Sequence, residues 1–275
     1  MLDAGVATPV GDAGNETKMD GGSGPARSAG CATGAGLAAG VHTFTLDATA
    51  RRYVVRLPTG YTKDKAWPVV LALHPNGSSA AYWDATTGAQ NIRAAVAKDA
   101  VLVIPEAIGG NWRDYAEAEA TWPARLEKEL RYTDRILSTV RAQLCVKEDA
   151  IFAMGFSGGG SFAGVLACRR TDIRAFAAGG AVVYFDKNQC VGKSAPWITI
   201  GAEELIPARV EFRDFFRTRS TCATTSKATT PSPCVAYDGC AAETPTTYCQ
   251  HAGGHVWPMF GTTASWQFFK QFVGP

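Results

Sequence analysis

The sequence has 275 residues, of which 46% are hydrophobic and 19% are charged, and its net charge is +2. This length and composition predict one domain of about 250 residues with a full core, and they argue against a second large domain. The basic residues form no runs and no apolar stretch approaches the ~20 residues that span a bilayer, so neither nucleic-acid binding nor membrane insertion is predicted.

The N-terminal segment, residues 1–30, is rich in Gly, Ala, Asp, Ser and Thr and has few large apolar side chains. Such a segment buries too little surface to offset the entropy lost on ordering. We therefore expect a disordered linker over 1–30, tethering a folded domain over 31–275 to a cell envelope or another module. The first residues do not resemble a secretory leader, and we expect that a leader was removed and Met1 added.

Eight cysteines are scattered through the chain, and none forms a C-x-x-C pair. Their even number favours disulfides and hence a secreted or cell-envelope protein, with free thiols in an intracellular protein as the alternative. Cys168 and Cys190 form a plausible pair because they are close in sequence, and the last four cysteines are expected to clamp the segment that holds them. The spacing of Cys and His does not fit a metal site, so no metal is predicted.

The order of strands and helices predicts an α/β fold with a mostly parallel central sheet, antiparallel N-terminal strands and helices on both faces. Alternating apolar residues over 41–46 and 52–57 indicate two half-buried antiparallel strands. Continuous apolar runs, as in buried parallel strands, cover 67–74, 101–105 and 151–156. Further strands are expected over 175–183 and 197–201, and helices around 91–97, 126–144, 161–168, 210–217 and at the C-terminus.

A candidate nucleophile lies where an apolar strand meets a helical stretch. Gly155, Ser157 and Gly159 there fit the pattern G-x-S-x-G. Small flanking residues allow the strained turn that exposes a serine hydroxyl in a cleft, at the carboxyl ends of the strands. The strand before and the helix after the motif favour a nucleophile at Ser157 over an ordinary Gly/Ser turn.

A nucleophilic serine needs a base within hydrogen-bond reach, and in this kind of fold the base is a histidine late in the chain. Only His251 and His255 follow Ser157. His255 lies in a loop shaped by two glycines and a proline, which suits the projection of an imidazole into a cleft. We therefore predict His255 as the base and interpret His251, close to Cys249, as a structural or surface histidine.

The acid that orients the base is expected just after the strand that ends at Gly201. Glu204 is the preferred candidate and Glu203 the alternative, because Glu can replace Asp in this role. The simpler interpretation is that both glutamates only begin the next helix, where negative charge is favourable. Asp186 and Asp214 remain further alternatives.

An oxyanion hole needs two backbone N–H groups aimed at the developing negative charge. Gly158 supplies the first, because it directly follows the candidate nucleophile. The second is expected from the loop after His74, where Pro75 has no N–H; Asn76 is therefore the preferred donor, with Gly77 or Ser78 behind it. His74 itself precedes Ser157 and is expected to anchor this loop.

Aromatic residues gather near these motifs, and for any single one of them packing is the simpler explanation. The polar segment 111–123 is a candidate cover over the site. Of the aromatic residues, Trp112 and Trp257 are predicted to contact substrate, since one lies in that segment and the other is two residues beyond His255.

Taken together, these motifs resemble secreted esterases of the feruloyl esterase, acetylxylan esterase and polyhydroxybutyrate depolymerase type, within the α/β-hydrolase superfamily. The resemblance extends from Ser28 to the C-terminal helix. It implies Ser157 as nucleophile and His255 as base, and it implies no cofactor. The stretches that carry it are 52–61, 73–77, 144–146, 155–159 and 254–258.

The chain departs from this family at two loops. Relatives usually have a His-Gly-Thr-x-Asp type sequence at the acid loop, whereas residues 200–207 contain two glutamates and no aspartate. Pro75 also stands where relatives often have glycine, which is expected to reshape the oxyanion hole.

The leading functional hypothesis is a secreted serine carboxylic-ester hydrolase that acts on feruloyl or acetyl esters of plant polysaccharide through an acyl-enzyme. A depolymerase of hydroxyalkanoate or other polyesters would use the same residues. A hypothesis from another class is a binding or surface protein in which the altered acid loop marks lost catalysis. The expected partner is a small or polymeric ester, and the oligomeric state is not specified by the sequence.

Overall fold

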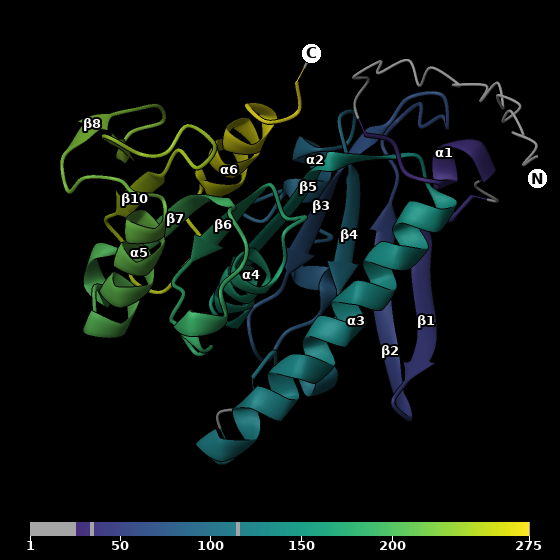
Figure 1. Cartoon of the computed structure of the whole chain (residues 1–275), viewed down its shortest axis with the longest axis horizontal. Coiled ribbons are helices and arrows are strands. Elements are labelled where there is room, and N and C mark those ends of the chain that lie inside the picture. Colours follow the sequence, from purple (N-terminus) through teal and green to yellow (C-terminus); the bar gives the residue numbers. More distant parts are fainter. Residues whose placement is uncertain (1–25, 34–35, 114–115, 275) are drawn as a thin grey trace, which may run out of the picture.

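The computed structural model describes residues 26–33, 36–113 and 116–274. Its strands form one ten-stranded sheet in the order β1-β2-β4-β3-β5-β6-β7-β10-β9-β8 (Figure 1). None of the helices in these three ranges is long and apolar enough to cross a membrane. The strands are β1 (Gly40–Leu46), β2 (Thr49–Arg56), β3 (Trp67–Leu73), β4 (Val101–Pro105), β5 (Val146–Phe156), β6 (Ala175–Gly179), β7 (Ala195–Gly201), β8 (Ser226–Ala228), β9 (Cys234–Tyr237) and β10 (Thr247–His251).

The centre of the sheet is parallel, from β4 through β3, β5, β6 and β7 to β10. β1 and β2 run antiparallel at one edge, which confirms the predicted antiparallel start of a mostly parallel sheet. At the other edge β9 and β8 are again antiparallel, a feature the sequence did not predict. β8 is exposed at every position and β9 has four residues, so neither carries a clear apolar pattern.

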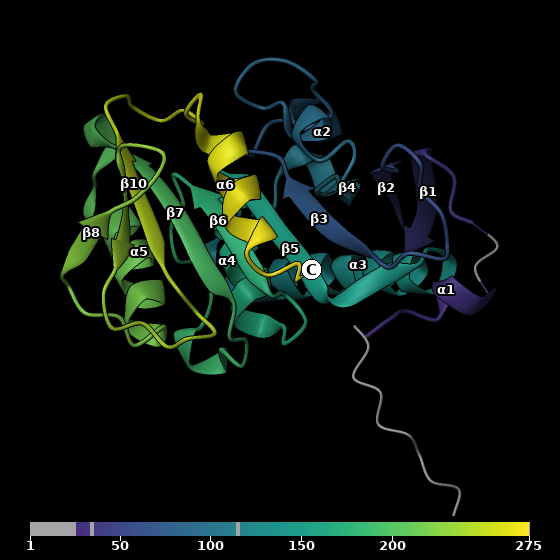
Figure 2. The same cartoon turned by 90° about the horizontal axis from the view of Figure 1, so that it is seen from above.

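Helices cover both faces of this sheet, as predicted. α3, α4 and α5 lie on one face, and α2 and α6 lie on the other (Figure 2). Strand β3 shows how one segment serves both layers, because Val69 and Leu71 join the first core while Val70 and Ala72 join the second. The helices are α1 (Gly30–Thr33), α2 (Ile92–Ala95), α3 (Trp122–Gln143), α4 (Gly158–Arg169), α5 (Pro207–Arg219) and α6 (Gly261–Lys270).

Several element boundaries differ from the sequence prediction, and two of these differences lie at carboxyl ends of central strands. The helix after β5 begins at Gly158, three residues earlier than expected, so that it starts directly after Ser157. The strand expected over 175–183 ends at Gly179, because Gly180 takes a φ of 57°, which ends an extended strand.

Four disulfides connect all eight cysteines. The predicted pair of Cys168 and Cys190 is confirmed, and the last four cysteines pair among themselves, as expected for a clamped segment. One of these bonds joins β9 to β10 at the sheet edge. The pairs are Cys31–Cys145, Cys168–Cys190, Cys222–Cys240 and Cys234–Cys249.

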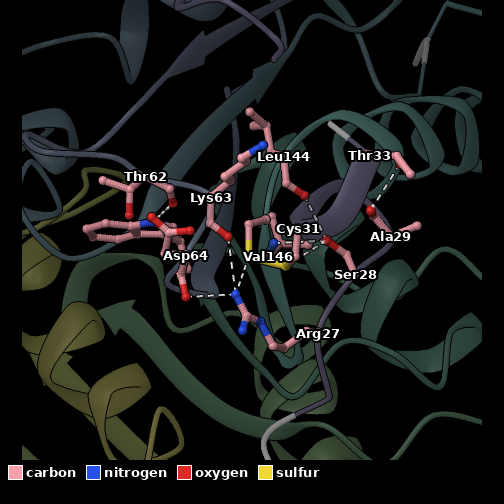
Figure 3. The surroundings of a disulfide bond; sticks show 12 residues. Arg27, Ser28, Ala29, Cys31, Thr33, Thr62, Lys63, Asp64, Leu144 and Val146 are labelled. Atoms are coloured by element: carbon pink, nitrogen blue, oxygen red, sulfur yellow. Dashed lines mark hydrogen bonds between the residues drawn. A yellow bond between two sulfur atoms is a disulfide. The ribbon is translucent and has the colours of Figure 1, made fainter. Parts of the chain in front are cut away.

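Residues just before the expected domain boundary at residue 31 contact the folded domain. Beside the first disulfide, the Ser28 hydroxyl accepts a hydrogen bond from the Val146 N–H at 3.0 Å, and the Arg27 guanidinium donates to the Asp64 carbonyl at 2.7 Å (Figure 3). These contacts attach the chain before the disulfide to the domain. The rest of the expected linker, residues 1–25, lies outside the described residues.

Candidate active site

Ser157 stands on the sharp turn between β5 and α4. Its backbone has φ 55° and ψ −120°, a region that a residue with a side chain rarely adopts and that active sites retain when the surrounding structure enforces it. The turn is tight enough that a Cβ at Gly155 would come closer than 3.0 Å to the backbone of Gly159. The glycines of the G-x-S-x-G motif are therefore required by space, and the turn presents the Ser157 hydroxyl beyond the end of the strand.

The structure brings His255 and Glu204 to Ser157. Glu204 ends a 3-10 turn directly after β7, and His255 lies on the loop after β10. Because β7 and β10 are parallel neighbours, both loops emerge at the same edge of the sheet. His255 Nε2 lies 2.9 Å from Ser157 Oγ, and His255 Nδ1 is hydrogen-bonded to Glu204 Oε2. With the Nδ1–H donating to the carboxylate, Nε2 is free to accept the serine proton.

The Glu204 carboxylate is buried, and each of its two oxygens has a partner. Its Oε1 accepts the Gly201 N–H at 3.1 Å, while its Oε2 faces both His255 and the guanidinium of Arg209, 3.2 Å away. Sequence reasoning did not single out Arg209. Its position two residues into α5 could have been noted, but nothing in the sequence says that its side chain folds back toward the acid.

The other candidate acids lie elsewhere. Glu203 contributes its backbone N–H to the Gly253 carbonyl at 3.4 Å, and its carboxylate lies over Gly254. Asp186 caps a short turn by accepting the Asn188 N–H at 2.9 Å. Asp214 pairs with arginines of its own helix. Of the four carboxylates considered, the structure therefore brings only Glu204 to the imidazole.

His251 ends β10 and is buried, in agreement with its interpretation as a structural histidine. Its Nδ1 accepts the Gly253 N–H at 3.3 Å. Burial lowers the pKa of His251 below its ordinary value, so its neutral form is favoured. The ring thus supports the loop that carries His255.

The predicted oxyanion donors lie side by side. Gly158 is the first residue of α4, where backbone N–H groups have no intrahelical acceptor. Its Cα packs against the Asn76 side chain so tightly that a Cβ would come closer than 3.0 Å to the Asn76 amide. The Asn76 N–H has no hydrogen-bond acceptor within the described ranges. The Gly77 N–H, the alternative donor, is already used by the Gly110 carbonyl and the Asn111 side chain.

Asn76 is fixed by its own side chain. Its Oδ1 accepts the Trp112 N–H at 3.1 Å, and its Nδ2 donates to the Arg113 carbonyl at 2.9 Å. These two bonds tie the loop after β3 to the loop after β4. The Asn76 side chain is thus held by these bonds beside Gly158.

His74 anchors the same loop from beneath, as the sequence predicted. Its Nε2 accepts the Ala107 N–H at 3.1 Å, and its Nδ1 donates to the Pro75 carbonyl at 2.8 Å. Burial lowers the pKa of His74, which matches a neutral ring because Nε2 must stay unprotonated to accept.

Trp112 and Trp257, predicted to contact substrate, are both buried, and this prediction is corrected. Trp112 is 0% exposed and stacks on Phe162 with ring centroids 4.6 Å apart. Trp257 is 3% exposed and packs edge-on against Trp83. Packing in the core determines where these two large apolar rings lie. The short sequence distance between Trp257 and His255 does not reveal this.

Other apolar side chains lie closer to the imidazole. The Phe156 ring centroid is 4.7 Å from that of His255, and Tyr82 stacks on Phe156 at 6.4 Å. Val256 and Met259, on the loop of His255, are exposed. The position of Phe156, directly before Ser157 in the motif, is a sequence signal that could have identified it.

No group of His, Cys, Asp and Glu within residues 26–33, 36–113 and 116–274 is arranged to hold a metal ion. The chemistry available to these residues is that of an activated serine beside preformed N–H donors, which fits acyl transfer.

Comparison with known families agrees with this chemistry. The model of the Esterase family, described as "Putative esterase", matches residues 48–233. The chain belongs to this family. As a family member with feruloyl esterases among its relatives, the protein is a carboxylesterase.

Curated relatives extend over nearly the whole chain. Feruloyl esterase D of Neurospora crassa is 26% identical over 281 residues, which covers 90% of this chain and 91% of that protein. Feruloyl esterase C of Emericella nidulans is 24% identical over 271 residues, with 89% and 91% covered.

Solved structures share the fold of this esterase. A ferulic acid esterase of Anaeromyces mucronatus, solved with ferulic acid, superposes with a TM-score of 0.58 at 15% identity, covering 86% of this chain and 91% of the other. An S-formylglutathione hydrolase of Agrobacterium tumefaciens gives 0.60 at 12% identity, covering 85% and 95%. At such identities the likeness establishes the α/β-hydrolase fold.

Proposed function

We propose that this carboxylesterase is a secreted feruloyl esterase that acts on plant polysaccharide esters through a Ser157–His255–Glu204 triad. The observation that carries the proposal is the continuous contact from the Ser157 hydroxyl through both nitrogens of His255 to a buried carboxylate. Serine, histidine and carboxylate in this order of contact activate a hydroxyl that is otherwise a weak nucleophile at neutral pH.

In the proposed reaction, Ser157 Oγ attacks the ester carbonyl carbon while His255 Nε2 takes the hydroxyl proton. The negative charge that forms on the carbonyl oxygen is stabilised by the N–H groups of Gly158 and Asn76. The C–O bond to the alcohol then breaks, and His255 returns the proton to the departing alcohol. A water molecule repeats the sequence on the acyl-enzyme, releasing the carboxylic acid and free Ser157.

Two observations support a feruloyl substrate. Relatives named as feruloyl esterases align along about nine-tenths of the chain. Aromatic and apolar side chains also lie near His255: Phe156 contacts its ring, Tyr82 stacks on Phe156, and the neighbouring Val256 is exposed. An aromatic acyl group gains more from such a surface than an acetyl group, because it buries more apolar area.

Secretion is supported by the four disulfides, because such bonds persist in oxidising compartments and are rare in the cytosol. A secreted enzyme would also reach its substrate, because the polysaccharide esters of plant cell walls lie outside the cell.

The test of this function compares initial hydrolysis rates on methyl ferulate, p-nitrophenyl acetate, acetylated xylan and a 3-hydroxybutyrate oligomer, using the wild type and Ser157→Ala. We expect methyl ferulate to be the best of the non-activated esters and the variant to lose several orders of magnitude in turnover. Preference for acetylated xylan or for the oligomer would reassign the substrate to acetyl esters or polyesters. Absence of Ser157-dependent hydrolysis would favour a non-catalytic binding protein.

A further inference from the structure

Arg209, on the first turn of α5, makes contacts that point to a role in the proposed reaction. Its Nη2 lies 3.2 Å from Glu204 Oε2 and 3.1 Å from His255 Nδ1. The same guanidinium donates through Nη1 to the Glu204 carbonyl and through Nε to the Gly180 carbonyl, each at 3.2 Å. The side chain is 15% exposed. Three contacts anchor this cation beside the base: two hydrogen bonds to backbone carbonyls and the ion pair with the Glu204 carboxylate.

Glu204 Oε2 contacts both the base and the cation. It is hydrogen-bonded to His255 Nδ1 and forms an ion pair with Arg209 Nη2, and Nη2 also lies within hydrogen-bond distance of Nδ1. The three side chains thus contact one another pairwise. The arginine therefore fixes the carboxylate in the position where it can orient the imidazole.

The charge of Arg209 also acts on the base. Without it, an imidazolium on His255 would face a lone buried carboxylate, which would strongly stabilise the protonated ring. With it, the ring faces a pair with no net charge. We therefore expect removal of the cation to raise the pH at which activity is lost on acidification.

The remaining charged groups near His255 in the described structure are few. Glu203 lies over Gly254 on the adjoining turn, and His251 at the end of β10 faces Glu204. Neither has a hydrogen bond to the imidazole in the described structure. Arg209 and Glu204 are therefore the charges that contact the base directly.

We propose that Arg209 is a positioning residue that orients the Glu204 carboxylate and extends the activity of the esterase toward lower pH. The proposal rests on the proposed function, because it assigns Arg209 a role only if His255 is the base. The proposal has two effects that can be measured separately. The charge of Arg209 affects the pH profile, whereas its hydrogen bonds to the Gly180 and Glu204 carbonyls hold the geometry and affect turnover.

The test is the pH dependence of kcat/KM on p-nitrophenyl acetate for the wild type, Arg209→Met and Arg209→Lys. Loss of the cation in Arg209→Met should move the acid limb upward by about half to one pH unit, reduced from the full effect of a contacting charge because His255 is 40% exposed. Arg209→Lys keeps the cation but cannot reproduce all three contacts. It should retain the wild-type acid limb while kcat falls several-fold at every pH.

Arg213→Met is the matched control, because Arg213 lies one turn further along α5 and pairs with Asp214. It removes the same charge from the same helix and should leave the acid limb in place. An unchanged limb in Arg209→Met, or an equal shift in Arg209→Lys or Arg213→Met, would overturn the proposal. Failure of the proposed function would look different, because the wild type would then show no hydrolysis that depends on Ser157.

The proposal can still be tested if Arg209→Met does not fold. Thermal unfolding of each variant detects a loss of folding, and Arg209→Gln then replaces Arg209→Met, since glutamine retains a donor for the carboxylate but carries no charge. The expected shift of the acid limb is the same.

Discussion

Replacing Gly158 by alanine places a methyl group inside the space of the Asn76 amide. The ideal Cβ at this position lies closer than 3.0 Å to both Oδ1 and Cγ of Asn76. To avoid this clash, the Asn76 side-chain amide must move by about 1 Å, and the close packing of protein interiors resists such a movement. That movement breaks its bonds to Trp112 and Arg113, at about 1 kcal/mol each, in addition to about 1–3 kcal/mol for overpacking.

We therefore expect Gly158→Ala to lower the free energy of unfolding by about 3–5 kcal/mol. Displacement of the Asn76 loop would also remove one oxyanion donor, which lowers kcat by roughly 10²–10³-fold. The stability is measured by urea denaturation, and the turnover is measured on p-nitrophenyl acetate with folded protein.

The decisive comparison is the double variant with Asn76→Ala. This second change removes the atoms that the new methyl group meets, so the double variant should be little less stable than Asn76→Ala alone. The coupling between the two sites should therefore approach the full cost of Gly158→Ala, about 3–5 kcal/mol. If the two costs add to within about 0.5 kcal/mol, Asn76 does not pack against Gly158 as described and the account of the oxyanion loop is wrong.

Three further predictions concern the acid, the anchor and the first disulfide. Glu204→Gln should lower kcat by roughly 10³–10⁴-fold because the amide no longer stabilises an imidazolium, whereas Glu203→Gln should stay within a few-fold; equal losses in steady-state assays would contradict the assignment of the acid. Burial lowers the pKa of His74 in the folded protein, so on acidification the unfolded state binds this proton first. The stability that the neutral ring contributes is therefore present above the ordinary pKa of 6.5 and is lost as the pH falls below it. Urea titrations should therefore show a shallower loss of stability on acidification in His74→Gln than in the wild type, and an equal slope would refute this. Replacing Cys31 and Cys145 by serine opens a link across 114 residues and should cost about 2–5 kcal/mol; a loss smaller than that for the bond spanning 15 residues would contradict the entropic reasoning.

The turn at Ser157 could be predicted from sequence because local constraints define it. Glycine at 155 and 159, an apolar strand before and a helix after are all readable within one short segment. The parallel centre of the sheet was predictable for a similar reason, since each buried strand is a continuous apolar run.

What the sequence did not reveal depends on contacts between distant segments. β8, β9 and β10 are short and in part polar, and they are defined by pairing with one another and with β7. The folding of Arg209 back toward Glu204 is a tertiary contact without a local pattern. The prediction that Trp112 and Trp257 contact substrate was wrong because nearness in sequence to a functional motif does not decide whether a ring faces the site or the core.

The central claim is that Ser157 is the nucleophile of this esterase, and trapping the covalent enzyme tests it most directly. The wild type, Ser157→Ala and Ser161→Ala would be treated with a fluorophosphonate, and the modified peptide would be identified by mass spectrometry. Ser161 is a matched control because it lies one turn into α4 and its hydroxyl accepts the Val182 N–H. We expect one adduct per chain, on Ser157, in the wild type and in Ser161→Ala, with none in Ser157→Ala. An adduct on another residue, or no adduct in a wild type that hydrolyses esters, would contradict it.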